Sequence, residues 1–285
     1  MNILSKDELV QLAGDLQVLP DVARKVIDTI SSESGSASQL SSVIEKDQSI
    51  AARVLKISNS ALYCSRQEVT SLQQAVITLG GNAIKNIALA VSTKSLYKYS
   101  GIAEHMMWDH AIGVAIAARL IAADHGRELA EVAFIGGLMH DVGKVVMNNE
   151  AHEAFIEVMK SSYNNGVDSL DAENAVFGYN HIDVGSKVVE KWGFPSNLVQ
   201  ILARHHLNKC SLEDISDPLV AKATASVALA DSICKQLGIG YRNQDDTVVI
   251  HMHPSVAFLH LSKDKVDKLI EETGTVYQQE KALFQ

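Results

Sequence analysis

Apolar residues recur at every third and fourth position through most of this 285-residue chain, and that spacing limits what it can fold into. The apolar stretches are rich in Ala, Leu and Ile, and only 4 prolines interrupt them. Aromatic residues, which are enriched in strands, make up 5% of the chain. The pattern therefore predicts an all-α protein built as a multi-helix bundle.

Start and stop signals place the individual helices. Ser5 and Glu8 have the spacing of a capping box, Thr70 and Gln73 form a second box, and Asn82 can cap a long helix toward residue 98. The turn Leu79-Gly80-Gly81 separates two helices. Others are predicted from Leu19-Pro20 to about residue 33 and at 37–46, 48–59, 104–124, 129–141, 150–164, 169–177, 181–192, 197–207, 218–237 and 263–283. Thr247–His251 is a short strand-like run, too isolated to build a sheet.

The polar segment Tyr97–Gly101 marks a soft boundary in the chain. We expect an N-terminal helical subdomain over 1–98, which packs on a helical domain over 99–240. A C-terminal extension over 241–285 ends in a helix. No internal repeat or low-complexity tract is present.

The net charge of the chain disfavours some classes of binding partner. The chain has 25 Lys and Arg against 34 Asp and Glu, a net charge of −9, which disfavours direct binding to nucleic acid or to an anionic membrane. The apolar runs are short and interrupted, and the first residues, MNILSKDELV, lack the basic and then apolar order of a signal peptide. We expect a cytoplasmic protein whose Cys64, Cys210 and Cys234 are reduced structural thiols.

The Leu79-Gly80-Gly81 turn has two interpretations. A helix-turn-helix that reads DNA is one, and Lys85, Lys94 and Lys98 follow the turn. The segment has no arginine and the chain is acidic, so a packed helical hairpin is favoured.

Polar residues on otherwise apolar helix faces carry the functional signal, because burial of such groups is costly unless they are paired or bind metal. Each of five predicted helices or helix ends directs His or Asp toward the core. The residues are His110, His140, Asp141, His181, His205, His206 and Asp231. Gly143, just after His140 and Asp141, suits a left-handed helix end.

Taken singly, these residues have structural explanations, since an inward His is usually a hydrogen-bonded core residue and an Asp can pair with a nearby Lys. Together they favour a metal site, because imidazole and carboxylate suit zinc, iron or manganese and bundle cores often hold such clusters.

The order His110, His140-Asp141, Asp231 resembles the H…HD…D signature of the HD superfamily of metal-dependent phosphohydrolases, and GGLMHDVGK is similar to its central motif. More narrowly, the chain resembles the HDOD family over residues 15–235. That likeness rests on LPDVARKVIDTI, IEKDQSIAARVLKISNSALY, SLQQAVITLGGNAIKNIAL, GLMHDVGK and FGYNHIDVGSKVVEKWGFPSNLVQILARHH. HDOD modules are generally signalling outputs, many with eroded metal ligands, whereas this sequence keeps the whole set.

The added His181 and His205-His206 are similar to the HD-GYP branch of the superfamily, where extra histidines hold a second metal. Two departures stand out. LNKCSLED follows His206 without a Gly-Tyr-Pro loop, and Met106 stands four residues before His110, where trinuclear members carry an acidic ligand.

The resemblance implies one or two divalent transition-metal ions, either iron, manganese, zinc or nickel. Our hypothesis places His110, His140, Asp141 and Asp231 on one ion, with Asp141 bridging to a second held by His181, His205 and His206.

Asp141 and Lys144 are the candidate catalytic residues. Lys144 either faces a phosphate oxygen or is a solvated lysine near a helix end. Glu173, Asp183 and Lys187 either support the ligand imidazoles or are surface charges.

Two classes of function stay open. In the first, an HDOD signalling module binds a separate signalling protein through its N-terminal bundle. In the second, a metal-dependent phosphohydrolase acts on a phosphoester such as a nucleotide or a cyclic dinucleotide.

Overall fold

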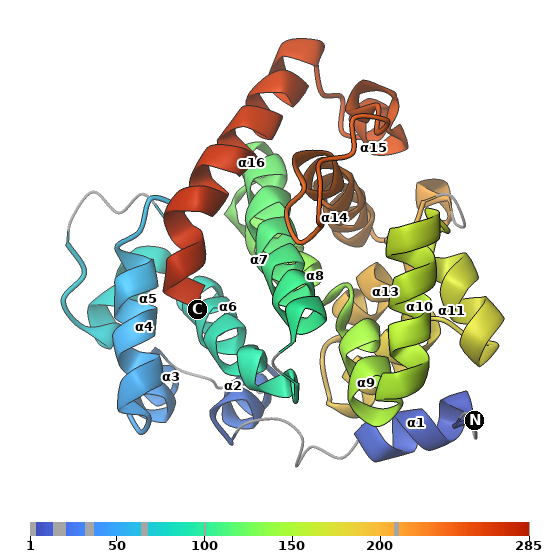
Figure 1. Cartoon of the computed structure of the whole chain (residues 1–285). Coiled ribbons are helices and arrows are strands. Elements are labelled where there is room, and N and C mark those ends of the chain that lie inside the picture. The colour runs from blue at the N-terminus through green and yellow to red at the C-terminus, as the bar shows by residue number, and fades with distance from the viewer. Residues whose placement is uncertain are drawn as a thin grey trace.

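A computed structural model describes residues 4–13, 21–31, 37–63, 68–99, 101–207 and 211–284, and within these ranges it contains helices and no strand. The all-α prediction is therefore confirmed (Figure 1). The α-helices are α1 (Lys6–Ala13), α2 (Asp21–Ser31), α3 (Ala37–Ile44), α4 (Gln48–Ser58), α5 (Leu72–Leu79), α6 (Gly81–Thr93), α7 (Ile102–Ala122), α8 (Arg127–Met139), α9 (Val142–Glu150), α10 (His152–Asn165), α11 (Ser169–Phe177), α12 (His181–Lys191), α13 (Ser196–Arg204), α14 (Pro218–Leu237), α15 (Pro254–Phe258) and α16 (Lys263–Phe284). Short 3₁₀ turns are η2 (Lys94–Leu96), η3 (Ala123–His125), η4 (Leu212–Asp214) and η5 (Ile250–Met252).

The first group of helices surrounds α6, which packs against α2, α4 and α5. Nearly every residue of α6 from Ala83 to Thr93 is buried, as expected for a helix enclosed by neighbours. The α5–α6 turn is thus a packed helical hairpin, as predicted, and the side chains of α6 are used for packing within the protein.

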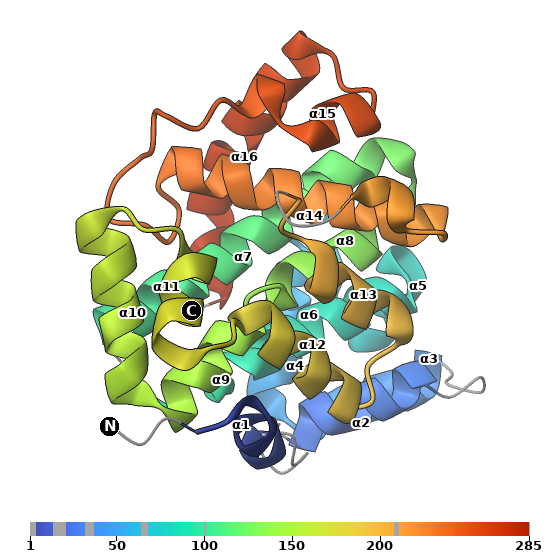
Figure 2. The same cartoon turned by 90° about the vertical axis from the view of Figure 1, so that its right-hand side faces the viewer.

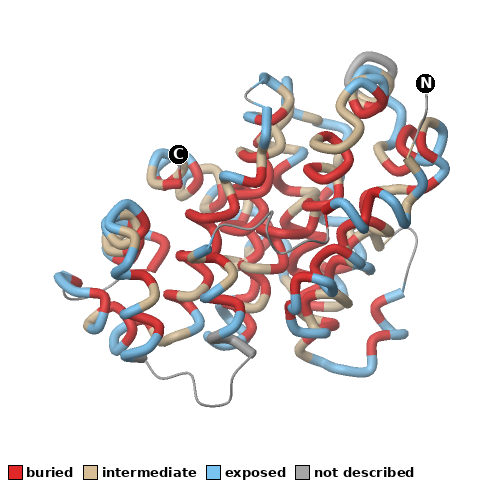
Figure 3. The backbone as a smooth tube through the Cα atoms, turned by 90° about the horizontal axis from the view of Figure 1, so that it is seen from below, coloured by how far each residue is buried: buried red, intermediate tan, exposed pale blue. Residues whose placement is uncertain are grey.

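The second group is built on α7, α8 and α14, which pack closely on one another. Helices α9 to α13 continue this group, and α1 lies on α9 and α12 (Figure 2). The two groups meet where α6 contacts α8 and where α16 contacts both α4 and α7. Buried residues concentrate where the helices face one another (Figure 3). The division into 1–98, 99–240 and 241–285 stays a prediction.

Helix α7 differs from the expectation that apolar runs are short. By length and composition alone, Ile102–His125 could cross a membrane, with a mean hydropathy of 1.3 over its most apolar window. That window is 67% buried inside the structure, where α7 packs on α8, α14 and α16. The apolar composition is thus explained by a central position in the core.

Capping residues explain several helix starts. Asp47, Asn180 and Asp217 accept hydrogen bonds from the first backbone amides of α4, α12 and α14. The predicted cap at Thr70 is wrong by one residue, since Ser71 caps α5, and Asn82 lies inside α6 instead of capping it.

The remaining sequence predictions have mixed outcomes. The strand-like run at 247–251 leads into the 3₁₀ turn η5, and the sequence pattern missed α9 and α15. Cys234 is buried and reduced. Cys64, Cys210 and the dipeptide Leu19-Pro20 lie outside the described residues, as does Gly14, which the sequence predicts as the end of the first helix.

A buried ion pair links the two groups of helices. Arg119 Nε on α7 lies 3.2 Å from Glu131 Oε1 on α8, and Asn86 of α6 donates to Glu131 Oε2 at 3.0 Å. Arg119 also donates to the carbonyl of Leu62 at 2.7 Å and lies over the ring of Tyr63. Because both charges are hydrogen-bonded, their burial is compensated.

Gly143 fixes the approach of α9 to α12. A Cβ atom at this position would lie 2.0 Å from the carbonyl oxygen of His181 and 2.9 Å from the backbone nitrogen of Gly185. The predicted left-handed turn at Gly143 is wrong, because the residue lies within α9 and its φ is not positive. A side chain is instead excluded by the neighbouring backbone, and this close approach brings Asp141 beside His181.

We predict that Gly143→Ala lowers the free energy of unfolding by about 1–3 kcal/mol or more, because the added methyl group forces two helix backbones apart. The matched control is Gly81→Ala, where a Cβ meets nothing within 4 Å and φ is not positive. That substitution should leave stability unchanged or raise it by about 0.4–1 kcal/mol. Urea unfolding followed by circular dichroism measures both, and equal stabilities would contradict the prediction.

Candidate metal centre

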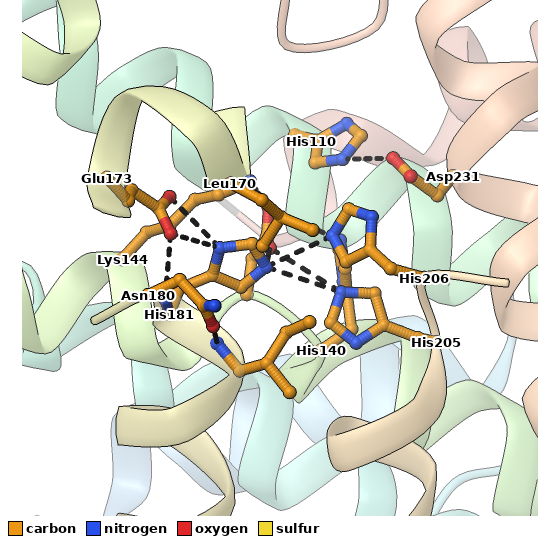
Figure 4. A network of polar contacts seen from close by, with 12 residues as sticks. His110, His140, Lys144, Leu170, Glu173, Asn180, His181, His205, His206 and Asp231 are labelled. Carbon is orange, nitrogen blue, oxygen red and sulfur yellow. Dashed lines mark hydrogen bonds and ion pairs between the residues drawn. The ribbon is translucent and has the colours of Figure 1, made fainter. Parts of the chain in front are cut away.

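The seven candidate ligands come from five places in the second group of helices and meet at one place (Figure 4). His110 lies on α7, and His140 and Asp141 form the junction between α8 and α9. His181 begins α12, His205 and His206 follow α13, and Asp231 lies on α14. That these residues bind metal stays a prediction.

One group of ligand atoms belongs to His110, His140 and Asp141. These atoms lie within 4.8 Å of one another. His110 Nε2 is also 3.0 Å from Asp231 Oδ1, and His140 Nε2 is 3.4 Å from Asp141 Oδ2. The group therefore offers two imidazoles and two carboxylates.

A second group consists of Asp141, His181, His205 and His206, whose ligand atoms also lie within 4.8 Å of one another. His181 Nε2 lies 3.2 Å from Asp141 Oδ1, 3.2 Å from His206 Nε2 and 3.5 Å from His205 Nε2. Two nitrogens on one zinc-like ion, each about 2.1 Å from it, are about 3.0–3.4 Å apart in octahedral or tetrahedral geometry. Asp141 belongs to both groups.

In four of the histidines, the ring nitrogen that points away from the cluster is Nδ1. The hydrogen bond that Nδ1 makes determines which way the lone pair of the other nitrogen, Nε2, faces. His110 Nδ1 donates to the carbonyl of Ile239 at 3.1 Å, His140 Nδ1 to that of Gly137 at 2.7 Å, and His205 Nδ1 to that of Leu202 at 2.8 Å. His181 Nδ1 donates to a carboxylate, Glu173.

Carbonyl and carboxylate oxygens only accept hydrogen bonds, so the proton of each neutral ring is on Nδ1 and the Nε2 lone pair faces the cluster. This is the tautomer that a metal ligand requires.

The cluster contains polar atoms that the protein leaves unsatisfied. Nε2 of His110, Nε2 of His140 and Oδ1 of Asp141 are buried, and although each lies near another polar atom of the cluster, none of them has a hydrogen-bond partner among the described residues. The Nε2 lone pairs of His181 and His205 face each other at 3.5 Å. Lone pairs in such contact repel unless a cation lies between them, and buried polar atoms without partners are rare. The residues therefore fit a cationic ligand.

The electrostatic environment keeps the carboxylates ionised. Burial alone would raise the pKa of Asp141, but His140, Lys144 and His181 outweigh it and hold that pKa well below its ordinary value. The pKa of Asp231 is likewise lowered, because the nearby imidazoles, first of all His110, outweigh burial.

Burial, reinforced by neighbouring histidines, lowers the pKa of His205 well below its ordinary value and that of His206 to about 4. For His140, Asp141 outweighs burial and raises the pKa. At neutral pH, Asp141, Asp231, His205 and His206 are thus in their metal-binding forms.

Lys144 lies at the cluster. Its Nζ is 2.7 Å from Asp141 Oδ2, and only 16% of its side chain is exposed. Burial would lower the pKa of Lys144, but Asp141 and Glu173 outweigh it and raise that pKa. Lys144 is therefore largely buried beside Asp141 and is not a solvated surface lysine, and its role toward a phosphate stays a prediction.

The three candidate supporting residues have different positions. Glu173 is fully buried against His181. Asp183 belongs to the capping box of α12 with Asn180, and Lys187 lies on the surface near Asp7.

Sequence reasoning missed the turn after α14 that covers His110. The carbonyl of Ile239 holds its ring, and the ring of Tyr241 lies edge-on to it with centroids 5.1 Å apart. Gly240 has φ +78°, and a Cβ there would lie 2.4 Å from Cβ of His110. The closely spaced Gly238 and Gly240 were the available signal, since both have positive φ.

Solved structures of other proteins share the fold of this chain. The crystal structure of an HDOD domain protein of unknown function from Geobacter sulfurreducens matches with a TM-score of 0.74 at 23% identity, covering 97% of both chains. A candidate signal transduction protein from Marinobacter aquaeolei VT8 matches at 0.69 and 20% identity, covering 93% of this chain and 58% of that one. A candidate metal-dependent phosphohydrolase from Shewanella amazonensis SB2B matches at 0.64 and 19% identity, covering 97% and 98%.

Sequence comparison gives the family. An uncharacterized protein of Treponema pallidum (strain Nichols) is 20% identical over 193 residues, which is 67% of this chain but only 38% of that relative. The sequence model of the HDOD domain matches residues 16–208, well over half of the chain. The protein thus belongs to the HDOD family.

Proposed function

We propose that the protein is an HDOD signal-transduction module that holds two divalent transition-metal ions in its His/Asp cluster. The observation that carries the proposal is that Asp141 offers a carboxylate to both ligand groups. His110, His140 and Asp231 complete the first site, and His181, His205 and His206 complete the second. Mixed imidazole and carboxylate ligands suit iron, manganese, zinc or nickel.

The signalling role is supported by the way in which the ligands are distributed. They come from α7, from the α8–α9 junction, from α12, from the end of α13 and from α14, so bound ions would brace these helices against one another. The Marinobacter neighbour, described as a candidate signal transduction protein, supports the same role. In this proposal a separate signalling protein binds the N-terminal helices, and neither nucleic acid nor a membrane takes part.

The first test is metal content. We predict about two metal ions per chain in the purified protein and their loss in Asp141→Asn, since this carboxylate serves both sites. Asp28→Asn, on an exposed position of α2, is the matched control and should keep both ions. Elemental analysis by mass spectrometry measures the content. A folded wild-type protein that takes up no ion when supplied with iron, manganese, zinc or nickel would contradict the proposal.

Removal of the ions should destabilise the fold, because a ligand that binds only the native state stabilises it. At a free metal concentration of 100 times Kd, one site contributes about 2.7 kcal/mol. Chelation should therefore lower the thermal midpoint of the wild type, and added metal should restore it. Asp141→Asn should show neither change, whereas an equal response of both proteins would argue against binding at this cluster.

A second candidate function, a metal-dependent phosphohydrolase, is favoured by Lys144. A bound metal pair supplies Lewis-acid activation of a water and of a phosphoester. In this alternative the Lys144 ammonium, which lies 2.7 Å from Asp141, would stabilise negative charge on a phosphoryl group of a nucleotide or cyclic dinucleotide. The Shewanella neighbour described as a candidate metal-dependent phosphohydrolase supports this alternative.

Turnover separates the two functions. If the module only signals, the metal-loaded protein should hydrolyse a generic phosphodiester and cyclic dinucleotides no faster than Asp141→Asn does. If it is a hydrolase, Lys144→Met should lower kcat by about 10²–10³-fold. Lys160→Met is the control, because Lys160 forms a similar i,i+3 ion pair with Glu157 on the surface. Measurable wild-type turnover that is sensitive to Lys144 would replace the first proposal by the second.

A further inference from the structure

His181 is held differently from three other histidines of the cluster. The outer nitrogens of His110, His140 and His205 donate to neutral backbone carbonyls. His181 Nδ1 instead lies 2.7 Å from Oε2 and 3.0 Å from Oε1 of Glu173. A hydrogen bond to an ionised acceptor is stronger than one to a carbonyl, so this ring is the most firmly oriented of the four.

Glu173 also accepts a hydrogen bond from the backbone of His181. His181 is the first residue of α12, where the helix provides no acceptor for its amide hydrogen. That amide donates to Glu173 Oε2 at 2.7 Å. One carboxylate thus fixes both the start of α12 and the direction of the ring that begins it, as Figure 4 shows.

The position of Glu173 is electrostatically costly. The residue is 0% exposed, on a helix whose Leu170 and Phe177 are also buried. An ionised carboxylate in such a place requires compensating positive charge or hydrogen bonds. Among the described residues, the hydrogen bonds to Glu173 come from the two N–H groups of His181, and the ammonium of Lys144 adds an attraction from a greater distance. A cation on the far side of the His181 ring would provide the missing compensation.

The two ligand groups also differ in their number of carboxylates. The first ligand group contains two carboxylates, Asp141 and Asp231, whereas the second contains only the shared Asp141 beside three histidines. Glu173 adds a further carboxylate behind the second group, hydrogen-bonded to the far nitrogen of the His181 ring. With Glu173 included, the two sites have equal numbers of carboxylates.

We propose that Glu173 is a positioning residue for the second metal site, where it holds His181 as the Nδ1–H tautomer and strengthens binding through its negative charge. This inference rests on the proposed dinuclear centre and adds to it the residue that determines how tightly the second ion is held. Outer partners of this kind change metal affinity by about 10–100-fold when they are substituted.

The test compares metal binding in the full-length wild type and in Glu173→Gln. The amide keeps the size of the side chain and an oxygen acceptor but removes the charge. Titration of metal-free protein with Zn²⁺ against a competing chelator should show two binding events in the wild type. In Glu173→Gln, one event should weaken about 10–100-fold while the other stays within about threefold.

Glu104→Gln is the matched control, because Glu104 is also a buried glutamate that accepts a side-chain hydrogen bond, from Asn148 at 2.7 Å. It should bind both ions like the wild type. If the two binding events of the wild type were both unchanged in Glu173→Gln, or were weakened equally, the positioning role of Glu173 would be overturned. The proposed dinuclear centre would stand. No binding by the wild type would overturn the proposed function itself.

A second measurement observes the His181 ring in the wild type. In metal-free protein labelled with ¹⁵N-histidine, the His181 signal, identified by its loss in His181→Gln, should report a proton on Nδ1 and none on Nε2. A proton on Nε2 in place of Nδ1 would overturn the proposal, because that tautomer cannot present a lone pair to the second site.

Discussion

The contact between Asp141 and its surrounding imidazoles is the interaction on which the functional half of this protein depends. Asp141 Oδ1 lies 3.2 Å from His181, Asp141 Oδ2 lies 3.4 Å from His140, and the nearest ammonium, that of Lys144, is 2.7 Å away. A carboxylate this deeply placed is stable only among positive or hydrogen-bonding partners. Lys144 supplies one such partner, and the imidazoles, whose Nε2 lone pairs face the carboxylate, would share a bound cation with it.

Close helix packing makes that contact possible. Gly143 lets α9 approach the start of α12 until no side chain fits between them, and this brings Asp141 to His181. On the other side, the turn at Gly240 lets the chain lie directly over His110 and hold its ring. The buried Arg119–Glu131 pair joins this arrangement to the N-terminal helices. Small residues and compensated charges therefore determine the geometry of the cluster.

Much of the fold and of the candidate site could be predicted from the sequence. The spacing of apolar residues predicted the helices, and the same periodicity placed His110 and Asp231 on inward faces. The helix α9 was missed because Gly143 looks like a helix end in sequence, whereas in the structure it is a contact point within a helix. The C-terminal turn over His110 was missed because nothing local to residues 238–241 indicates what they pack against.

The roles of Glu173, Asp183 and Lys187 show where sequence reasoning ends. All three lie near the histidines in sequence, and no local pattern distinguishes a buried carboxylate from a helix cap or a surface charge. The sequence by itself determined the helical class, the inward faces and the ligand types, because these depend on periodicity and side-chain chemistry. Only the tertiary structure decided that Asp141 lies in both ligand groups and that Glu173 holds His181, because those contacts depend on how separate helices approach one another in space.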